Sequence, residues 1–401
     1  WTKVGTISPV DIEFFDGSTT VPLVTGYVVG TGNSWPWDPT GNGIPNVKAE
    51  NCTVTVKDSR DAFKSVVTKT SNAFAIRPVI TTTAPALVRA GQSATINWSI
   101  TGSPCTVSFI QLQQKIAGTG YVDVGSPVNA SAGSGTISWP VPAQTSTNTY
   151  VRIVDTSNAN INDPSDLIAI AGYLSLDAFS TTSWAIGSTQ TIAWHAKGIS
   201  KVISYYSLNG VDGWVAVQNG ASGEADGETP AGSGLGSTQW TIPETVNVSQ
   251  TAKIKIVDKA DPTVTNAISP ETLHLCAAFS NILPSGGLPV LAKEPCEITW
   301  YTKGANVPKV LLEYQDSSGW HPVYTVGDNL VTNVQGANSY IWTSVPEDAL
   351  TDAAQIRVTD PGNSEATATG TNFWIKGEIT VTVPSGTQSW EVGTDSIITW
   401  T

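Results

Sequence analysis

A tryptophan recurs along the chain at intervals of roughly 100 residues. Four similar tetrapeptides end in Trp98, Trp194, Trp300 and Trp400, and Trp1 lies one such interval before Trp98. A fixed period of this length indicates a tandem array in which each repeat is one structural unit with its own core. The period therefore constrains the architecture more than any other feature of the sequence.

Two further signatures follow each repeated tryptophan in an unchanging order. The first contains a second tryptophan, at Trp139, Trp240 and Trp342, and the next is an alternating apolar run that ends in aspartate, at Asp58, Asp155, Asp258 and Asp360. Apolar residues at every second position are typical of a strand with one buried face. We therefore predict an all-β protein in which each repeat is an antiparallel β-sandwich of about seven strands, with the repeated tryptophans in its core.

The repeats divide the chain into four units and a remainder. We expect repeat 1 at 1–78, repeat 2 at 79–173, repeat 3 at 174–277, repeat 4 at 278–377 and the first strands of a fifth at 378–401. Repeat 1 lacks the first strands that the other repeats possess, and 378–401 contains that missing pair. Two interpretations fit: a window of a longer array, or a polymer in which these strands of one subunit complete repeat 1 of the next.

The surface charge excludes two classes of partner. Asp and Glu exceed Lys and Arg by 33 to 20, and the net charge is −13. Such a chain repels nucleic-acid phosphates and anionic membrane surfaces. The sequence also contains no apolar run long enough to span a bilayer, so we expect neither a nucleic-acid partner nor a membrane span in this segment.

The motifs in repeat 2 resemble those of a known family of surface domains. Gly91, Ile96 and Trp98 are followed by Trp139 and Pro142 and then by Arg152 and Asp155. This order is similar to that of the Kre9/Knh1-type Ser/Thr-rich domains, which are found in yeast wall proteins and in S-layer-like surface proteins. The resemblance implies tandem immunoglobulin-like β-sandwiches with a spacer or surface-coat role, and it implies no activity.

The residues do not predict an enzyme. The three histidines, His195, His274 and His321, fall at unrelated positions of the repeat and show no metal-binding spacing. The most noticeable carboxylates are periodic, as expected of structural residues, whereas a glycosidase pair would be unique to one repeat.

The aspartates that end the alternating runs allow two interpretations. They could begin Asx turns, or their loops could bind calcium through carboxylate, carbonyl and amide oxygens. The candidate calcium ligands are Asp58, Asp155, Asp163, Asp166, Asp258 and Asp360. No cofactor is required, and calcium is the one ion that we consider.

Four cysteines allow three pairings. Cys276 and Cys296 flank the junction of repeats 3 and 4, so we predict a disulfide between them; Cys52 and Cys105 flank the junction of repeats 1 and 2. The alternative is a set of small buried thiols.

Aromatic and glycosylation motifs supply the remaining candidate sites. Trp35, Trp37, Trp214 and Trp320 could stack on sugars or contact a neighbouring subunit, or they could pack within their own repeats. Four triplets match the N-glycosylation pattern, at Asn51, Asn97, Asn129 and Asn247.

These features predict an extracellular structural protein at the cell surface. We expect a self-assembling lattice or coat component, S-layer-like, whose partners are copies of itself. An adhesin or carbohydrate-binding stalk that recognises cell-surface glycans is one alternative. The other is a spacer region of a larger secreted protein.

Overall fold

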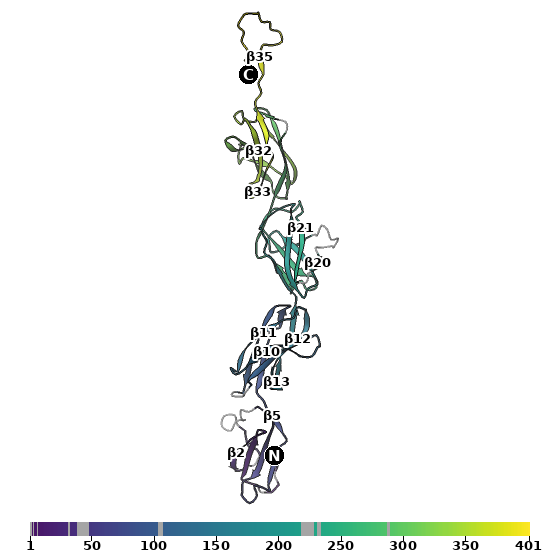
Figure 1. The fold of residues 1–401 in the computed structure, drawn as a ribbon, viewed down its shortest axis with the longest axis vertical. Helices are drawn as coiled ribbons and strands as arrows, with labels where there is room; N and C mark the ends of the chain where they lie inside the picture. Colours follow the sequence, from purple (N-terminus) through teal and green to yellow (C-terminus); the bar gives the residue numbers. More distant parts are fainter. Residues whose placement is uncertain are drawn as a thin grey trace. The chain divides into compact units, whose positions relative to one another are not determined.

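The structure is a computed structural model that describes residues 2, 4–5, 7–30, 33–37, 48–102, 107–217, 228–230, 234–286 and 289–401. The chain divides into two compact parts, residues 1–173 and 174–401, and each is considered by itself. Every regular element of the described residues is a strand (Figure 1). No helix of the described residues could therefore cross a membrane.

Repeat 2 shows the complete arrangement of strands. One sheet has the order β11-β8-β6, and its strands are β6 (Val79–Thr83), β8 (Ser93–Thr101) and β11 (Ser134–Pro140). The other sheet has the order β10-β9-β12-β14-β7, with β13 also paired to β12. Its strands are β7 (Leu87–Arg89), β9 (Phe109–Ile116), β10 (Val122–Asn129), β12 (Ser146–Asp155), β13 (Asn158–Pro164) and β14 (Ile168–Ala171). The pairing of β7 with β14 is parallel, whereas the other pairings are antiparallel.

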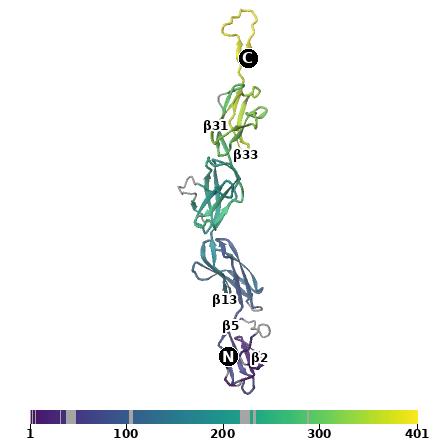
Figure 2. The ribbon, with the colours of Figure 1, turned by 180° about the vertical axis from the view of Figure 1, so that it is seen from behind.

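Repeats 3 and 4 have the same order, except that two short strands in each stand where repeat 2 has the single strand β10. In repeat 3 the strands are β15 (Tyr173–Leu176), β16 (Ser183–Ala185), β17 (Thr189–Lys197), β18 (Lys201–Ser207), β19 (Val215–Ala216), β20 (Glu228–Pro230), β21 (Leu235–Thr241), β22 (Ser249–Asp258), β23 (Asn266–Ile268) and β24 (Leu273–Cys276). In repeat 4 they are β25 (Ala278–Leu283), β26 (Val290–Leu291), β27 (Cys296–Lys303), β28 (Lys309–Asp316), β29 (Gly319–Pro322), β30 (Leu330–Thr332), β31 (Gly336–Trp342), β32 (Thr351–Asp360), β33 (Asn363–Thr369) and β34 (Phe373–Lys376). The strands β31 and β33, labelled in Figure 2, belong to opposite sheets of repeat 4.

Two segments of the chain carry parts of this arrangement. The described strands of repeat 1 form one sheet, with the order β2-β1-β3-β4 and β5 also paired to β3. They are β1 (Val10–Phe15), β2 (Thr20–Tyr27), β3 (Ala49–Asp58), β4 (Thr68–Thr70) and β5 (Phe74–Ile76). Residues 378–401 contain a two-stranded antiparallel sheet of β35 (Val381–Val383) and β36 (Thr399–Trp400). We call residues 378–401 the ribbon.

The repeated tryptophans lie in the cores of the sandwiches, as the sequence predicts. Trp98, Trp139, Trp194, Trp240, Trp300 and Trp342 are all buried. Each complete repeat has its own cluster of buried apolar residues drawn from both sheets. The prediction of tandem immunoglobulin-like sandwiches is confirmed by these cores and by the recurring strand order.

Candidate functional site: the joints between repeats

The four periodic aspartates form the same turn. In each repeat the backbone N–H two residues later donates a hydrogen bond to the aspartate Oδ1, and each aspartate is buried. The donors are Arg60 on Asp58 at 3.0 Å, Ser157 on Asp155 at 2.9 Å, Ala260 on Asp258 at 2.9 Å and Gly362 on Asp360 at 2.8 Å. The Asx turn, one of the two interpretations from sequence, is therefore present in all four repeats.

Five of the six candidate calcium ligands have a side-chain contact with another part of the protein: Asp58, Asp155, Asp163, Asp258 and Asp360. Arg60 lowers the pKa of Asp58, and burial raises the pKa of Asp155 but is outweighed by hydrogen bonds from Lys48 and Ser157. Asp163 accepts the backbone N–H of Thr82 at 2.6 Å, which ties β13 to β6. Asp166 is exposed. Across the described ranges, no three His, Cys, Asp or Glu side chains are grouped to hold a metal, so the calcium prediction gains no support.

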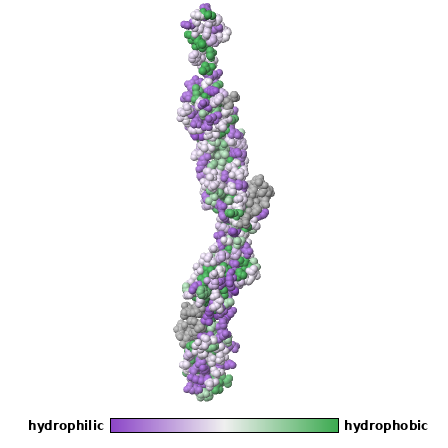
Figure 3. Space-filling model, viewed as in Figure 1, coloured by the Kyte–Doolittle hydropathy of each residue, from purple (hydrophilic) through white to green (hydrophobic). Residues whose placement is uncertain are grey.

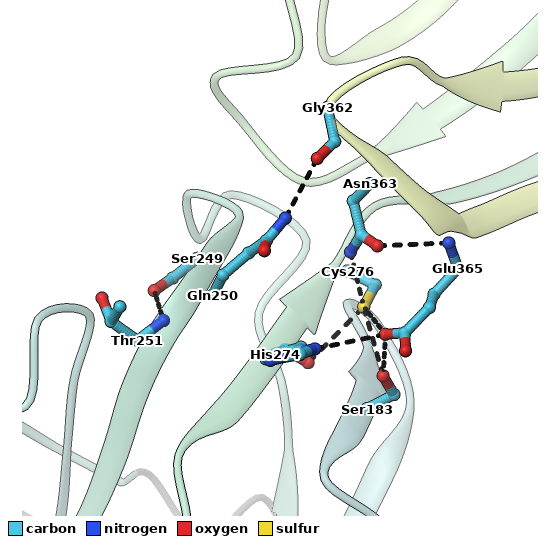
Figure 4. A network of polar contacts seen from close by, with 9 residues as sticks. All are labelled: Ser183, Ser249, Gln250, Thr251, His274, Cys276, Gly362, Asn363 and Glu365. Atoms are coloured by element: carbon cyan, nitrogen blue, oxygen red, sulfur yellow. Dashed lines mark hydrogen bonds and ion pairs between the residues drawn. The ribbon is translucent and has the colours of Figure 1, made fainter.

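The hairpin that follows Asp360 contacts repeat 3. Asn363 and Glu365 of β33 face Ser183 on β16 and His274 and Cys276 on β24 (Figure 4). The Asn363 amide nitrogen lies 3.1 Å from the Cys276 sulfur, and Glu365 Oε2 lies 3.3 Å from His274 Nδ1. The Ser183 hydroxyl also donates to Glu365. These hydrogen bonds lower the pKa of Glu365, with Ser183 contributing most and His274 next.

Other loops extend the contact between repeats 3 and 4. The Gln250 amide donates to the Gly362 carbonyl at 3.0 Å (Figure 4), and Lys303 pairs with Glu244 at 2.9 Å. Val248 packs against the cores of both repeats, and its N–H donates to the Ala305 carbonyl at 3.0 Å. The joint therefore combines an apolar contact with polar contacts from several loops.

The joint between repeats 1 and 2 uses the equivalent hairpin. Asn158, three residues after Asp155, donates to the Glu50 carboxylate, which also pairs with Arg77 at 2.6 Å. Hydrogen bonds from Arg77 first and Asn158 second lower the pKa of Glu50 to about 2. Lys48 of repeat 1 forms an ion pair with Asp155 at 2.8 Å. Asn158 and Asn363 thus make the same kind of contact in two joints.

The predicted disulfide is wrong, because Cys276 and Cys296 are separate free thiols. Cys276 ends β24 and faces the hairpin of repeat 4, whereas Cys296 begins β27 and its sulfur lies 3.7 Å from the Glu297 carbonyl oxygen. Burial raises the pKa of both thiols. Cys52 is also a free buried thiol, and Cys105 lies outside the described residues.

The candidate ligand-binding tryptophans, Trp35, Trp37, Trp214 and Trp320, are half-buried in their own repeats. Trp37 makes edge contacts with Phe14 and Phe74 in repeat 1. The Lys255 ammonium lies 4.3 Å from the Trp214 ring centre, and the Arg357 guanidinium lies 4.1 Å from that of Trp320.

The same cation–π pair exists in repeat 2, where the Arg152 guanidinium lies 4.0 Å from the Tyr121 ring centre. In repeats 2, 3 and 4 the basic residue stands three positions before the periodic aspartate. This spacing is visible in the sequence, and it is the signal from which the pairs could have been predicted. The cation covers one face of each ring, which leaves less aromatic surface for a sugar.

The remaining candidate residues are dispersed over the described surface. His195 contacts Asp177 and His321 contacts Asp316, each at 3.2 Å within its own repeat, whereas His274 contacts Glu365 across a joint. Asn51, Asn97, Asn129 and Asn247 are exposed, and their glycosylation stays a prediction.

Comparison with known proteins identifies no family for this chain. No family model and no curated protein matches the chain. A marsupial T cell receptor is among the solved structures that match, with 11% identity and a TM-score of 0.20, covering 73% of this chain and 98% of that chain. So low a TM-score carries no argument, and the joints are therefore interpreted from their own geometry.

Proposed function

We propose that this protein is an extracellular structural protein, a lattice or coat component in which immunoglobulin-like repeats set fixed distances. The observation that carries the proposal is the repeated joint, in which Asn158 and Asn363 fasten equivalent hairpins to the preceding repeats. A spacer must hold each repeat in a fixed orientation relative to the next one. Hydrogen bonds between neighbouring repeats restrict bending at the joint.

The roles of the ionisable residues support a function without catalysis. The periodic aspartates accept turn hydrogen bonds, and each of the three histidines contacts a different carboxylate. A general acid or nucleophile needs a base and an oriented partner within hydrogen-bond reach of one reacting atom. The contacts of these residues are instead those of turns and joints.

The surface charge supports an exported protein that has little tendency to associate unspecifically. Charged residues form only 13% of the chain, and the net charge of −13 disfavours unspecific association. The cations that cover Trp214 and Trp320 weigh against a stalk that binds glycans through these rings. Copies of the chain are therefore the partners that we propose.

Labelling of intact source cells tests this function. Antibodies against repeat 3 should bind intact cells, and tomography of the envelope should show a regular layer that disappears when the gene is deleted. An antibody against a cytosolic protein is the control for leakage. Labelling that requires permeabilised cells, or an envelope unchanged by the deletion, would overturn the proposal.

A further inference from the structure

The periodic aspartate of repeat 4 differs from its counterpart in repeat 2 in its partners. Asp155 forms an ion pair with Lys48 of repeat 1 at 2.8 Å, and Lys48 also donates to Ser157. Asp360 is only 7% exposed, and its Oδ1 accepts the Gly362 N–H of the Asx turn. Its other oxygen, Oδ2, has no hydrogen bond or ion pair with any residue that the structure describes. A buried carboxylate is stabilised by a cation, and Asp360 lacks one.

The sequence of repeat 3 explains why this cation is missing. The strands β3 and β22 are both ten residues long, and both end in the periodic aspartate. Lys48 comes immediately before β3, and Val248 comes immediately before β22. The residue that supplies the ammonium in the joint of repeats 1 and 2 is therefore replaced by valine in the joint of repeats 3 and 4.

Asp360 lines a cavity of about 470 Å³ in the joint of repeats 3 and 4. The lining combines apolar walls with polar groups from both repeats, and it includes Val248, Leu275, Pro308, Leu330, Gln250 and Asn363. This volume falls within the range of small-molecule sites, roughly 300 to 1,000 Å³. The free oxygen of a buried carboxylate and the valine that replaces a lysine therefore belong to one cavity.

Lys309 also lines the cavity, but its ammonium has another partner. It pairs with Asp328, which stands two residues before Leu330 at the start of β30. The two side chains are 51% and 49% exposed, so this ion pair lies toward solvent. Lys309 therefore does not take the place at Asp360 that Lys48 occupies at Asp155.

The lining favours an organic cation over a metal ion. Calcium takes six to eight oxygen ligands, and within the described ranges no three His, Cys, Asp or Glu side chains could share a metal. One carboxylate beside apolar walls suits an ammonium on a methylene stem. The face of repeats 3 and 4 drawn in Figure 3 is mostly polar or intermediate in hydropathy, which suits a small ligand better than a large apolar partner.

We propose that the cavity in the joint of repeats 3 and 4 binds a primary alkylammonium group, with Asp360 as its counter-ion. The ammonium donates to Asp360 Oδ2, and the methylene stem packs on Val248 and Leu275. A free amine and a lysine side chain of another molecule carry this same group. The bound ligand joins repeats 3 and 4 as Lys48 joins repeats 1 and 2. This binding site is independent of the proposed function.

Isothermal titration calorimetry of the 401-residue chain tests the site. The probe is N-α-acetyl-lysine methylamide, and its neutral match is the norleucine analogue, which has the same stem without the ammonium. We expect the lysine probe to bind, the norleucine analogue not to bind, and added salt to weaken the binding. Cadaverine, a free diamine, distinguishes the two sources, because the amine that binds more tightly identifies the kind of molecule that the cavity accepts.

Three variants locate the binding. Asp360→Asn keeps the acceptor of the Asx turn but removes the charge, so the affinity should fall about tenfold or more. Asp258→Asn makes the same change at the equivalent turn of repeat 3, away from the cavity lining, and it should bind the probe normally. Val248→Lys places an ammonium where Lys48 stands in the other joint, so it should occupy the cavity from within and abolish binding.

Three results would overturn the inference. They are a lysine probe that does not bind at about 10 mM, a norleucine analogue that binds as tightly as the lysine probe, and an affinity that Asp360→Asn leaves unchanged. Far-ultraviolet circular dichroism checks that each variant is folded. If Val248→Lys unfolds repeat 3, the comparison of Asp360→Asn with Asp258→Asn still decides the question.

Discussion

Asn158 and Asn363 occupy equivalent positions in two repeats, and each donates its side-chain amide to the repeat before it. The acceptor is the Glu50 carboxylate in one joint and the Cys276 sulfur, at 3.1 Å, in the other. Both asparagines follow an aspartate that closes an Asx turn. In both repeats, the same short hairpin therefore contains the Asx turn and donates a hydrogen bond to the preceding repeat.

The Asx turn itself should depend on an acceptor oxygen and not on charge. Asp360→Ala removes the oxygen that accepts the Gly362 N–H at 2.8 Å, and we expect repeat 4 to lose about 1 kcal/mol of stability. Asp360→Asn keeps an acceptor and should cost much less. Native-state hydrogen exchange resolved to the β32–β33 hairpin measures both, and equal losses in the two variants would contradict this role of Asp360.

A buried polar network in repeat 4 gives a second prediction. Asn333 accepts hydrogen bonds from Trp300 Nε1 at 2.8 Å and Thr302 Oγ1 at 2.7 Å. Asn333→Ala leaves Trp300 Nε1 buried without this acceptor and leaves Thr302 Oγ1 with only the Asn338 amide at 3.3 Å, so repeat 4 should lose about 2 to 4 kcal/mol. Thr332→Ala, at an exposed neighbour, is the control. Urea unfolding followed by Trp fluorescence compares them, and a loss no larger than that of the control would contradict the network.

The repeat period predicts the fold because core positions recur at fixed places. Trp98 and Trp194 lie on equivalent strands of two repeats, β8 and β17. The apolar alternation before Asp155 determines which face of β12 is buried. The same regularity allowed the Asx turns to be foreseen. Such local patterns report on strands and turns, since they depend on neighbours in sequence.

The joints could not be predicted in the same way. Asn363 and Cys276 are far apart in sequence, and nothing in the local pattern of either residue identifies its partner. The predicted Cys276–Cys296 disulfide failed for the same reason, because proximity to a junction does not determine which way a side chain points. The hairpins after Asp155 and Asp360 contact the preceding repeat through direct hydrogen bonds, whereas the sequence suggested only a turn or a calcium-binding loop at these aspartates.

Glu50 should make the joint of repeats 1 and 2 sensitive to acid. Its pKa of about 2 lies below the ordinary value of 4.5, so folding favours the ionised carboxylate. This stabilisation is fully present above pH 4.5 and is lost as the pH falls toward about 2. A carboxyl NMR titration should give a midpoint near the lower value, and Glu50→Gln should remove this part of the acid sensitivity; a midpoint near 4.5 would contradict the contact.

Cys276 should report on the opening of the joint of repeats 3 and 4. The thiol is buried, and its burial raises its pKa, so alkylation by iodoacetamide at neutral pH should be slow. Asn363→Ala should speed the labelling of Cys276 severalfold and leave Cys52, a buried thiol of repeat 1, unchanged. Peptide mapping without reductant measures both rates, and a linked Cys276–Cys296 peptide would contradict the free thiols.

The distance distribution across the joint of repeats 3 and 4 tests the central claim most directly. Spin labels on azidophenylalanine at the exposed positions Thr191 and Ile341 avoid the cysteines. Double electron–electron resonance should give one narrow distance distribution, which broadens in the double variant Asn363→Ala with Glu365→Ala. A broad distribution in the unmodified chain, or one that the double variant leaves unchanged, would contradict a structural array held by these hairpins.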